Sequence, residues 1–119
     1  MVNYRWSIFW ADLDPVTGSE QGGQRPVLVV SAEEVNQHLP IVTVLPLTST
    51  KPGRRVYPTE VLLTENATGL PKDSLAMAHQ IRTIAKSRLG EACGLISDVS
   101  IRIQIEGAMG RHLGLPSTR

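Results

Sequence analysis

The sequence predicts a mainly β fold of the α+β type, in which short strands form a small β-barrel with short accessory helices. This prediction rests on apolar segments that are short, closely spaced and separated by turns containing Gly, Pro or Asn. The 119 residues correspond to a single domain, 1–119, which is long enough to bury roughly two-thirds of its unfolded surface. The content of 41% apolar and 19% charged residues is typical of a globular protein rather than a disordered one.

The first half of the chain contains three segments that we interpret as strands. Residues 6–13 are aromatic and mostly apolar. Residues 26–31 do not alternate between apolar and polar, which predicts a strand buried on both faces. Residues 41–48 form the third strand, and Pro46 near its end indicates an edge strand or a bulge.

Short elements fill most of the remaining chain. Between the second and third strands, Ser31 is placed to cap a helix over residues 32–37, where Glu33 and Glu34 suit the positive end of the helix dipole. Four further strands and one helical turn are expected. The strands are Glu60–Leu63, 74–79, 80–84 and 91–95, and the helical turn is Lys86–Arg88.

The last apolar segment allows two interpretations. Residues 99–106 alternate apolar and polar side chains, which favours a strand. The residues Ile101, Ile105, Ala108 and Met109 follow helical spacing instead, and a residue just before them, Ser97 or Asp98, could cap a helix. From the residues alone, both interpretations stay open.

A polar loop between the first two strands is the most informative segment of the chain. Between Pro15 and Pro26 it contains three glycines and two glutamines and little that could pack in a core. Loops of this length inside compact domains are usually functional, and they are ordered by their own hydrogen bonds or by a ligand. At its end, Pro26 holds Arg25 in an extended conformation, which makes this cation a candidate for binding an anion.

The sequence argues against metal sites, disulfides, phosphate-binding motifs and membrane segments. The three histidines are far apart, none has a second ligand at close spacing, and Cys93 is the single cysteine, so we expect no metal, no cofactor and no disulfide. No phosphate-binding Gly motif precedes a helix, and no serine has a nucleophile-elbow context, although a serine–histidine–acid site stays open. No apolar run approaches the ~20 residues of a membrane span and no signal pattern is present, so we expect a cytoplasmic protein with no membrane partner.

Charge leaves the partner undecided. The formal net charge is +1, whereas many nucleic-acid binders are strongly basic, so any anion site must be local. The densest basic cluster is Lys51, Arg54 and Arg55 on a Pro/Gly loop, which is compatible with an anion site or with simple solvation. What remains after these exclusions is a set of fixed polar groups, most of which could donate hydrogen bonds to an anion. They are Arg25, Thr48 with Ser49, Asp73 with Ser74, and Gln80 with Arg82.

The order of these segments resembles the MazF/PemK family of toxin endoribonucleases. The resemblance lies in Asp-x-x-Pro-x-x-Gly-x-Glu-Gln-x-Gly-x-Arg-Pro at residues 12–26, in Leu-Thr-Ser at residues 47–49, and in Gln-Ile-Arg-Thr-Ile at residues 80–84. It implies an SH3-like small β-barrel of the CcdB/PemK type with a C-terminal helix, and it favours a helix for the last segment. It also implies a homodimer, and the apolar residues Ile101, Ile103, Ile105, Met109, Leu113 and Leu115 offer a surface for one.

The resemblance also implies site residues. Arg25 and Thr48 correspond to the catalytic arginine and threonine of the family, because a guanidinium presents a fixed fork of donors to phosphate oxygens and a hydroxyl adds a neutral donor. The implied substrate-binding residues are Glu20, Gln21, Ser49, Lys51, Asp73, Ser74 and Gln80. The loop over residues 64–72 lacks a common family pattern, which leaves the recognised RNA sequence open, and His79 is also unusual at its position.

Each of these roles has a structural alternative. Arg25 could pair with Glu20 and brace the loop, Thr48 could cap a turn, and Asp73 could initiate one. The aromatic residues Trp6, Phe9 and Trp10 are expected to pack in the core or an interface rather than to stack on bases.

The implied function is metal-independent, sequence-specific cleavage of single-stranded RNA, in particular mRNA, by the toxin of a type II toxin–antitoxin pair. The nucleophile implied is the RNA's own 2′-hydroxyl, so that no metal and no protein nucleophile is needed. The implied partners are single-stranded RNA and a cognate acidic antitoxin similar to MazE. The alternatives are a gyrase poison like CcdB, which binds protein and cleaves nothing, and a non-catalytic RNA-binding barrel. The former acts through C-terminal aromatic residues, which residues 115–119 lack.

Overall fold

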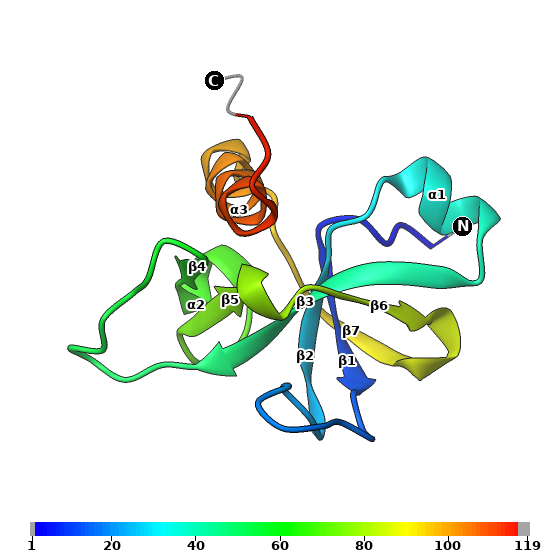
Figure 1. Cartoon of the computed structure of the whole chain (residues 1–119), viewed down its shortest axis with the longest axis horizontal. Helices are drawn as coiled ribbons and strands as arrows, with labels where there is room; N and C mark the ends of the chain where they lie inside the picture. Colours follow the sequence, from blue (N-terminus) through cyan, green and yellow to red (C-terminus); the bar gives the residue numbers. More distant parts are fainter. Residues whose placement is uncertain (1, 117–119) are drawn as a thin grey trace.

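The computed structural model describes residues 2–116, which form a curved antiparallel sheet with helices packed around it (Figure 1). The strands are β1 (Ser7–Asp12), β2 (Gln24–Val29), β3 (Ile41–Ser49), β4 (Glu60–Leu63), β5 (Ser74–Met77), β6 (Arg82–Ala85) and β7 (Leu89–Leu95). The helices are α1 (Glu33–His38), α2 (Glu65–Thr68) and α3 (Val99–Leu113), and two 3₁₀ turns are η1 (Ala78–Gln80) and η2 (Lys86–Arg88). The mainly β class with short helices and a C-terminal helix is confirmed.

The long strand β3 organises the sheet. The strand order is β4-β5-β3-β2-β1-β7, and β6 also pairs with β3. On the side away from β2, the first half of β3 pairs with β6 up to Val44↔Arg82, and its second half pairs with β5 from Leu47↔Ala76 onward. The sheet therefore diverges into two branches along β3, as Figure 1 shows.

Pro46 lies in the gap between these two branches, and the expectation that β3 is an edge strand is wrong. The strand is internal, with β2 on one side and β5 and β6 on the other. Between Val44 and Leu47 neither β5 nor β6 is in register with β3. A residue without an N–H group is tolerated at this change of partner because the ladder is already interrupted on that side.

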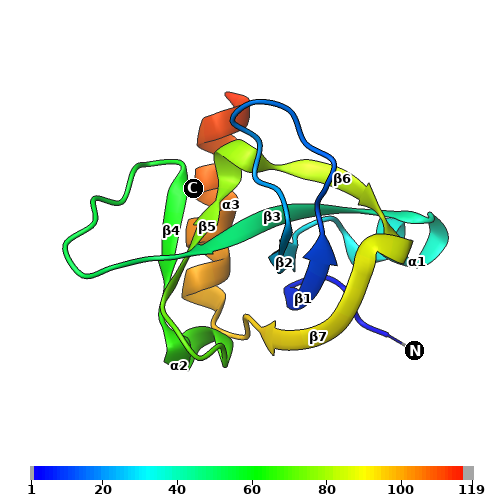
Figure 2. The same ribbon diagram turned by 90° about the horizontal axis from the view of Figure 1, so that it is seen from below.

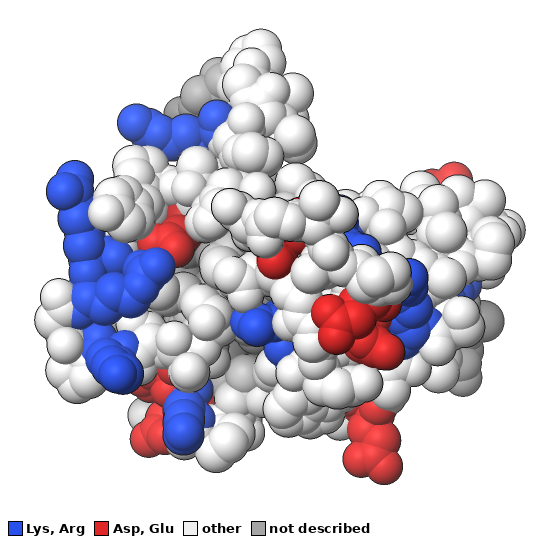
Figure 3. Space-filling model, turned by 60° about the horizontal axis from the view of Figure 1, so that its bottom comes forward, with Lys and Arg blue, Asp and Glu red and all other residues white. Residues whose placement is uncertain are grey.

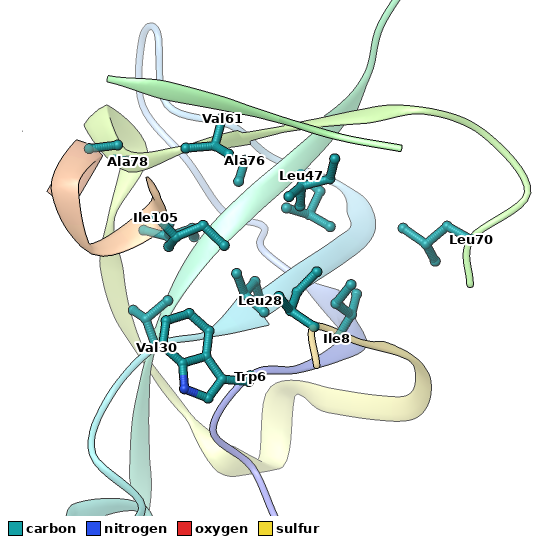
Figure 4. Packing of buried hydrophobic residues seen from close by; sticks show 14 residues of the cluster. Trp6, Ile8, Leu28, Val30, Leu47, Val61, Leu70, Ala76, Ala78 and Ile105 are labelled. Atoms are coloured by element: carbon teal, nitrogen blue, oxygen red, sulfur yellow. The ribbon is translucent and has the colours of Figure 1, made fainter. Parts of the chain in front are cut away.

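The core is divided by the sheet into two clusters. The larger one lies between the sheet and α3, where Ile105 is fully buried and Ala108 is 5% exposed (Figure 4). The smaller cluster covers the other face and includes Val27 and Val29 of β2. Both β2 residues and the intervening Leu28 are completely buried, which confirms a strand buried on both faces.

The C-terminal segment is helical, as the family resemblance implied. Asp98 caps α3 by accepting a hydrogen bond of 2.8 Å from the N–H of Ser100, and Gly114 ends it in the left-handed region at φ 69°. The alternating pattern over residues 99–106 does not produce a strand, because Ile105 and Ala108 at helical spacing pack on the sheet. Ile103 and Leu113 remain exposed on the outer side.

Other local expectations need correction. Ser31 does not cap α1: its hydroxyl bonds to the buried Asn36 and accepts from the N–H of Thr43. The strand expected at 74–79 ends at Met77, and His79 and Gln80 belong to η1. The loop over residues 64–72 contains α2, which Thr64 caps through the N–H of Ala67, a signal that the sequence contained.

Candidate active-site cleft

The polar loop between β1 and β2 is ordered mainly by its own hydrogen bonds. The carboxylate of Asp14 accepts from the N–H of Gly23 at 2.9 Å, and the N–H of Leu13 donates to the carbonyl of Gly23 at 3.0 Å. A Cβ on Gly22 would lie 2.7 Å from the Asp14 carboxylate and 2.8 Å from Val16, and Gly23 has φ +77°. A side chain at Gly22 would displace Asp14 or Val16, and one at Gly23 would strain the backbone, so glycine suits both positions of this closed loop.

Three polar side chains from η1, β6 and η2 hold this loop from outside. Gln80 accepts from the N–H of Gln21 and donates to the carbonyl of Ser19, both at 3.2 Å. Arg82 donates to the carbonyl of Leu13 at 3.2 Å, and Arg88 donates to the carbonyl of Asp14 at 2.9 Å. Figure 2 shows the loop standing beside the segment that contains η1. Gln80 and Gln21, both predicted to bind substrate, thus contact each other.

Arg25 is fixed at the start of β2 by two backbone carbonyls. Its Nε donates to the carbonyl of Gly22 at 2.9 Å, and its Nη1 donates to the carbonyl of Leu47 on β3 at 3.3 Å. Glu20 does not pair with it, because the Glu20 carboxylate accepts instead from the N–H of Thr17 at 2.7 Å. Within residues 2–116, Nη2 of Arg25 donates to no protein acceptor, so the half-buried guanidinium is oriented but keeps free donors.

Thr48 lies across the sheet from Arg25. The β2–β3 ladder pairs Val27 with Pro46, and the same register continued by two residues places Arg25 opposite Thr48. On its other side Thr48 pairs with Leu75 of β5. No side-chain hydrogen bond of Thr48 occurs in the described chain, so its hydroxyl does not cap a turn and is free to donate.

A cleft of about 350 Å³ opens at this end of the sheet. It lies where β1 and β3 end and β2 begins, and the loop before β5 closes one of its sides. Its lining residues are Trp10, Gln24, Arg25, Pro26, Leu47, Thr48, Ser49, Leu70, Pro71, Lys72 and Ser74. It therefore combines free polar donors with apolar walls, which is the usual composition of a ligand site.

The cleft brings together four of the predicted site residues, which are Arg25, Thr48, Ser49 and Ser74. The other five lie outside its lining. Glu20, Gln21 and Gln80 belong to the β1–β2 loop and its support. Lys51 follows the cleft on the exposed loop after β3, and Asp73 accepts from the N–H of Glu65 at 2.9 Å, which ties the loop before β5 to α2.

Seven of the eleven cleft residues were not predicted as site residues, and three of these seven, Gln24, Lys72 and Trp10, have polar or aromatic side chains that could contact a ligand. Gln24 and Lys72 carried a weak signal, because each directly precedes a predicted site residue in the chain. Trp10 was expected to pack, yet 45% of its surface is exposed, whereas Trp6 and Phe9 are 7% and 6% exposed. Alternation along β1 could not reveal this, because Ile8, Phe9 and Ala11 are all buried around it.

The basic loop between β3 and β4 is partly structural. Arg54 forms an ion pair of 3.0 Å with Glu60, whose side chain is only 2% exposed. Burial acts to raise the pKa of Glu60, but hydrogen bonds from Arg54 and the N–H of Tyr57 lower it overall. The guanidinium of Arg55 lies 5.0 Å from the centre of the Tyr57 ring. Figure 3 shows Lys and Arg side chains gathered on the side to which this loop extends in Figure 1.

Over residues 2–116, no three His, Cys, Asp or Glu side chains gather closely enough to hold a metal ion. In the same range no helix has both the length and the apolar character needed to cross a membrane.

Comparison with known proteins finds similarity over most of the chain. A family model of PemK-like, MazF-like toxins of type II toxin–antitoxin systems matches residues 4–106. Endoribonuclease MazF9 of Mycobacterium tuberculosis is 40% identical over 116 residues, covering 93% of this chain and 96% of that protein. Endoribonuclease MazF of Staphylococcus saprophyticus is 36% identical over 115 residues, covering 97% and 94%.

Solved structures agree with the sequence relatives. MazF from Deinococcus radiodurans has a TM-score of 0.79 and 28% identity, covering 97% of this chain and 99% of that one. A mycobacterial endoribonuclease in complex with its cognate antitoxin has a TM-score of 0.78 and 28% identity, covering 98% and 99%.

Proposed function

Because the chain belongs to the PemK-like, MazF-like toxins of type II toxin–antitoxin systems, we propose that its cleft is the active site of a sequence-specific endoribonuclease. The observation that carries this proposal is the pair of free donors, Arg25 and Thr48, which line the cleft from neighbouring strands at opposed positions of the continued β2–β3 register. Two relatives at 40% and 36% identity bear the name endoribonuclease, which supports the same reaction class. The functional unit is the whole chain, 1–119, acting as one toxin domain.

The proposed reaction uses the RNA itself as nucleophile. The ribose 2′-oxygen loses its proton and bonds to the adjacent phosphorus, while the bond from phosphorus to the 5′-oxygen breaks and that oxygen gains a proton. The products carry a 2′,3′-cyclic phosphate and a 5′-hydroxyl. No protein nucleophile and no metal ion is needed for this step.

Arg25 and Thr48 have distinct roles in this reaction. The carbonyls of Gly22 and Leu47 hold the Arg25 guanidinium in place, so its free donors meet the phosphorane oxygens without reorganisation as negative charge develops there. Thr48 donates a neutral hydrogen bond to the same group. Ser49 and Ser74 line the cleft beside them and would bind neighbouring parts of the RNA.

The substrate is single-stranded RNA, in particular mRNA, because unstacked bases expose edges that an A-form helix hides. Five predicted contacts lie outside the cleft lining, and their roles divide accordingly. Lys51 and Asp73 flank the cleft and would contact the extended strand, while Glu20, Gln21 and Gln80 would act through the order of the β1–β2 loop. We place this activity in the cytoplasm, where mRNA is available.

The proposed protein partners are a second copy of the chain and an acidic antitoxin similar to MazE. Exposed apolar residues on and beside α3 support a dimer: Leu95, Ile103, Leu113 and Leu115 are 50%, 45%, 51% and 60% exposed, although Ile105 is buried. A complex between a related mycobacterial endoribonuclease and its cognate antitoxin supports the second partner. A disordered acidic segment laid across the cleft would cover Arg25.

The direct experiment incubates the purified protein with a long RNA and maps the new 5′ ends. Cleavage at a short common sequence, with 5′-hydroxyl ends, is expected, and EDTA should not slow it. Intact RNA at every protein concentration would instead favour the gyrase-poison or RNA-binding alternatives, and random cleavage would contradict sequence specificity.

A further inference from the structure

We infer that Trp10 is a substrate-positioning residue, on whose indole ring an unstacked RNA base lies while the neighbouring phosphate is held at Arg25 and Thr48. This inference rests on the proposed function and adds to it a base-binding surface that the sequence analysis assigned to packing.

The exposure of Trp10 is unusual for its surroundings. Along β1, Ile8, Phe9 and Ala11 are 0%, 6% and 1% exposed, while Trp10 is 45% exposed. Leaving a large apolar ring in water forgoes hydrophobic stabilisation, and apolar surface exposed inside a concave site is typical of a ligand contact.

The main chain of Trp10 is closely packed although its ring is exposed. A Cβ on Gly90 of β7 would lie 3.3 Å from the Trp10 carbonyl oxygen and 3.7 Å from the Trp10 Cβ. On the other side, Trp10 is in register with Pro26 of β2. The backbone and Cβ of Trp10 are therefore held between β7 and β2, and the ring extends from them to line the cleft.

The indole of Trp10 lacks the aromatic and cationic contacts that other rings of the described chain have. Within the described chain no aromatic ring or cationic group stacks on Trp10, whereas the Trp6 ring has the guanidiniums of Arg5 and Arg102 at 5.1 and 5.4 Å from its centre. The ring of Trp6 therefore already has cationic partners within the protein. Trp10 is an aromatic surface without an internal partner.

The position of Trp10 relative to the catalytic pair fits a base beside the scissile phosphate. Pro26, its partner in the ladder, directly follows Arg25 in the chain. Stacking suits this location because every base has a π face, so Trp10 would hold the strand in register without reading its sequence. Base identity would then be read elsewhere, and the loop before β5, with Pro71 and Lys72, forms another wall of the same cleft.

The test measures binding of a short RNA that contains the mapped cleavage sequence and a 2′-deoxy sugar at the scissile position, so that it is not cut. Base–aromatic stacking of ~1–3 kcal/mol corresponds to an increase in Kd of about 5- to 150-fold for Trp10→Leu. Trp10→Phe keeps a ring and should lose less. The matched control is Leu39→Ala, which removes an equally exposed apolar side chain, 45%, at the opposite end of β3, and should leave Kd unchanged.

A second measurement identifies the stacked base. In the wild-type protein, removing single bases from the RNA should reveal one abasic position, next to the scissile phosphate, that weakens binding about as much as Trp10→Leu does. In Trp10→Leu the same abasic position should cause no further loss, because the two changes remove one interaction.

Three results would overturn the inference. One is a Kd for folded Trp10→Leu within about twofold of wild type. Another is fully additive losses from Trp10→Leu and every abasic position. The third is a change in dimer mass on light scattering with Kd unaltered, which would assign Trp10 to the contact between copies. In each case wild-type cleavage of RNA would persist, so failure of the inference is distinguishable from failure of the proposed function.

Discussion

The polar groups near the two ends of β3 differ in whether they have hydrogen-bond partners within the protein. At its start, near α1, the polar side chains bond to one another and to the backbone: Glu33 accepts from the N–H groups of Tyr4 and Arg5 and from Asn36 and Gln37. At its end, within the described chain, the hydroxyls of Thr48 and Ser49 and the Nη2 of Arg25 have no protein partner.

The polar groups near the start of β3 therefore stabilise the fold, whereas those at its end are available to a ligand. The Glu33 network satisfies buried and half-buried polar groups, and Asn36 at its centre is completely buried. The cleft residues Arg25, Thr48 and Ser49 instead keep solvent-accessible donors without a protein partner at a concave surface, where an anionic ligand can accept from them. Changes at the start of β3 should therefore reduce stability, and changes at its end should reduce activity.

The largest expected effect is that of Arg25→Ala on activity. Losing donors to a developing oxyanion costs ~10²–10³ in rate, and Arg25→Lys should be nearly as impaired because it keeps the charge but loses the fork of donors. The melting temperature should change by only a few degrees. Single-turnover cleavage and thermal unfolding measure both quantities, and near-normal turnover in a folded Arg25→Ala variant would remove Arg25 from the active site.

Glu33→Ala tests the other end of β3. It leaves the N–H groups of Tyr4 and Arg5 without their carboxylate and should lower the free energy of unfolding by roughly 2–4 kcal/mol. The rate of cleavage at temperatures where the variant is folded should match wild type. Urea denaturation monitored by fluorescence measures the loss of unfolding free energy. A large drop in cleavage rate without destabilisation would contradict a structural role for Glu33 and assign it to activity.

The same carboxylate predicts how stability depends on pH. Although burial acts to raise it, hydrogen bonds from the N–H of Arg5, from Asn36, from the N–H of Tyr4 and from Gln37 lower the pKa of Glu33 from 4.5 to about 2. A depressed pKa stabilises the folded state above the unfolded value, so this contribution is complete above about pH 4.5 and is lost as the pH falls toward 2. A loss on the order of 2 kcal/mol, reduced in Glu33→Gln, is expected from denaturation curves across this range. An identical acid dependence in both proteins would contradict this assignment.

Thr48→Ala should have the smallest effect of the four. A neutral hydroxyl donor contributes about 1 kcal/mol, which corresponds to a loss of ~10-fold or less in cleavage rate. Thr48→Ser keeps the hydroxyl and should recover most of the rate. Equal losses in both variants would point to packing of the Thr48 methyl group rather than to hydrogen bonding.

Much of the fold was predictable because local patterns and packing agree. The runs that became β2 and β4 carried clear strand signals, and the polar loop with Arg25 was recognisable from its glycines and Pro26. The helix α3 could not be derived from its residues alone, since its alternating pattern competes with helical spacing. Packing against the sheet through Ile105 and Ala108 decides between the two.

The site was predictable only in part, because tertiary packing again decides which side chains are available. Sequence patterns identify residue types at strand ends, but they do not report which side chains remain exposed after folding. Trp6 and Trp10 have similar surroundings in the sequence, yet the ring of Trp6 has two guanidiniums within 5.4 Å of its centre and Trp10 lines the cleft. Gln80 has a polar side chain like that of a substrate-binding residue, yet it bonds to the β1–β2 loop.

The central claim is that the cleft at the end of β3 positions RNA for attack by its own 2′-hydroxyl. The most direct measurement compares an all-RNA oligonucleotide containing the mapped cleavage sequence with a copy that has one 2′-deoxy sugar immediately 5′ of the scissile phosphate. We expect the deoxy copy to bind with nearly the same Kd and to resist cleavage, because only the nucleophile has been removed. Rapid cutting of the deoxy copy, or a 5′-phosphate on the product of the all-RNA substrate, would contradict this mechanism and indicate attack by an activated water.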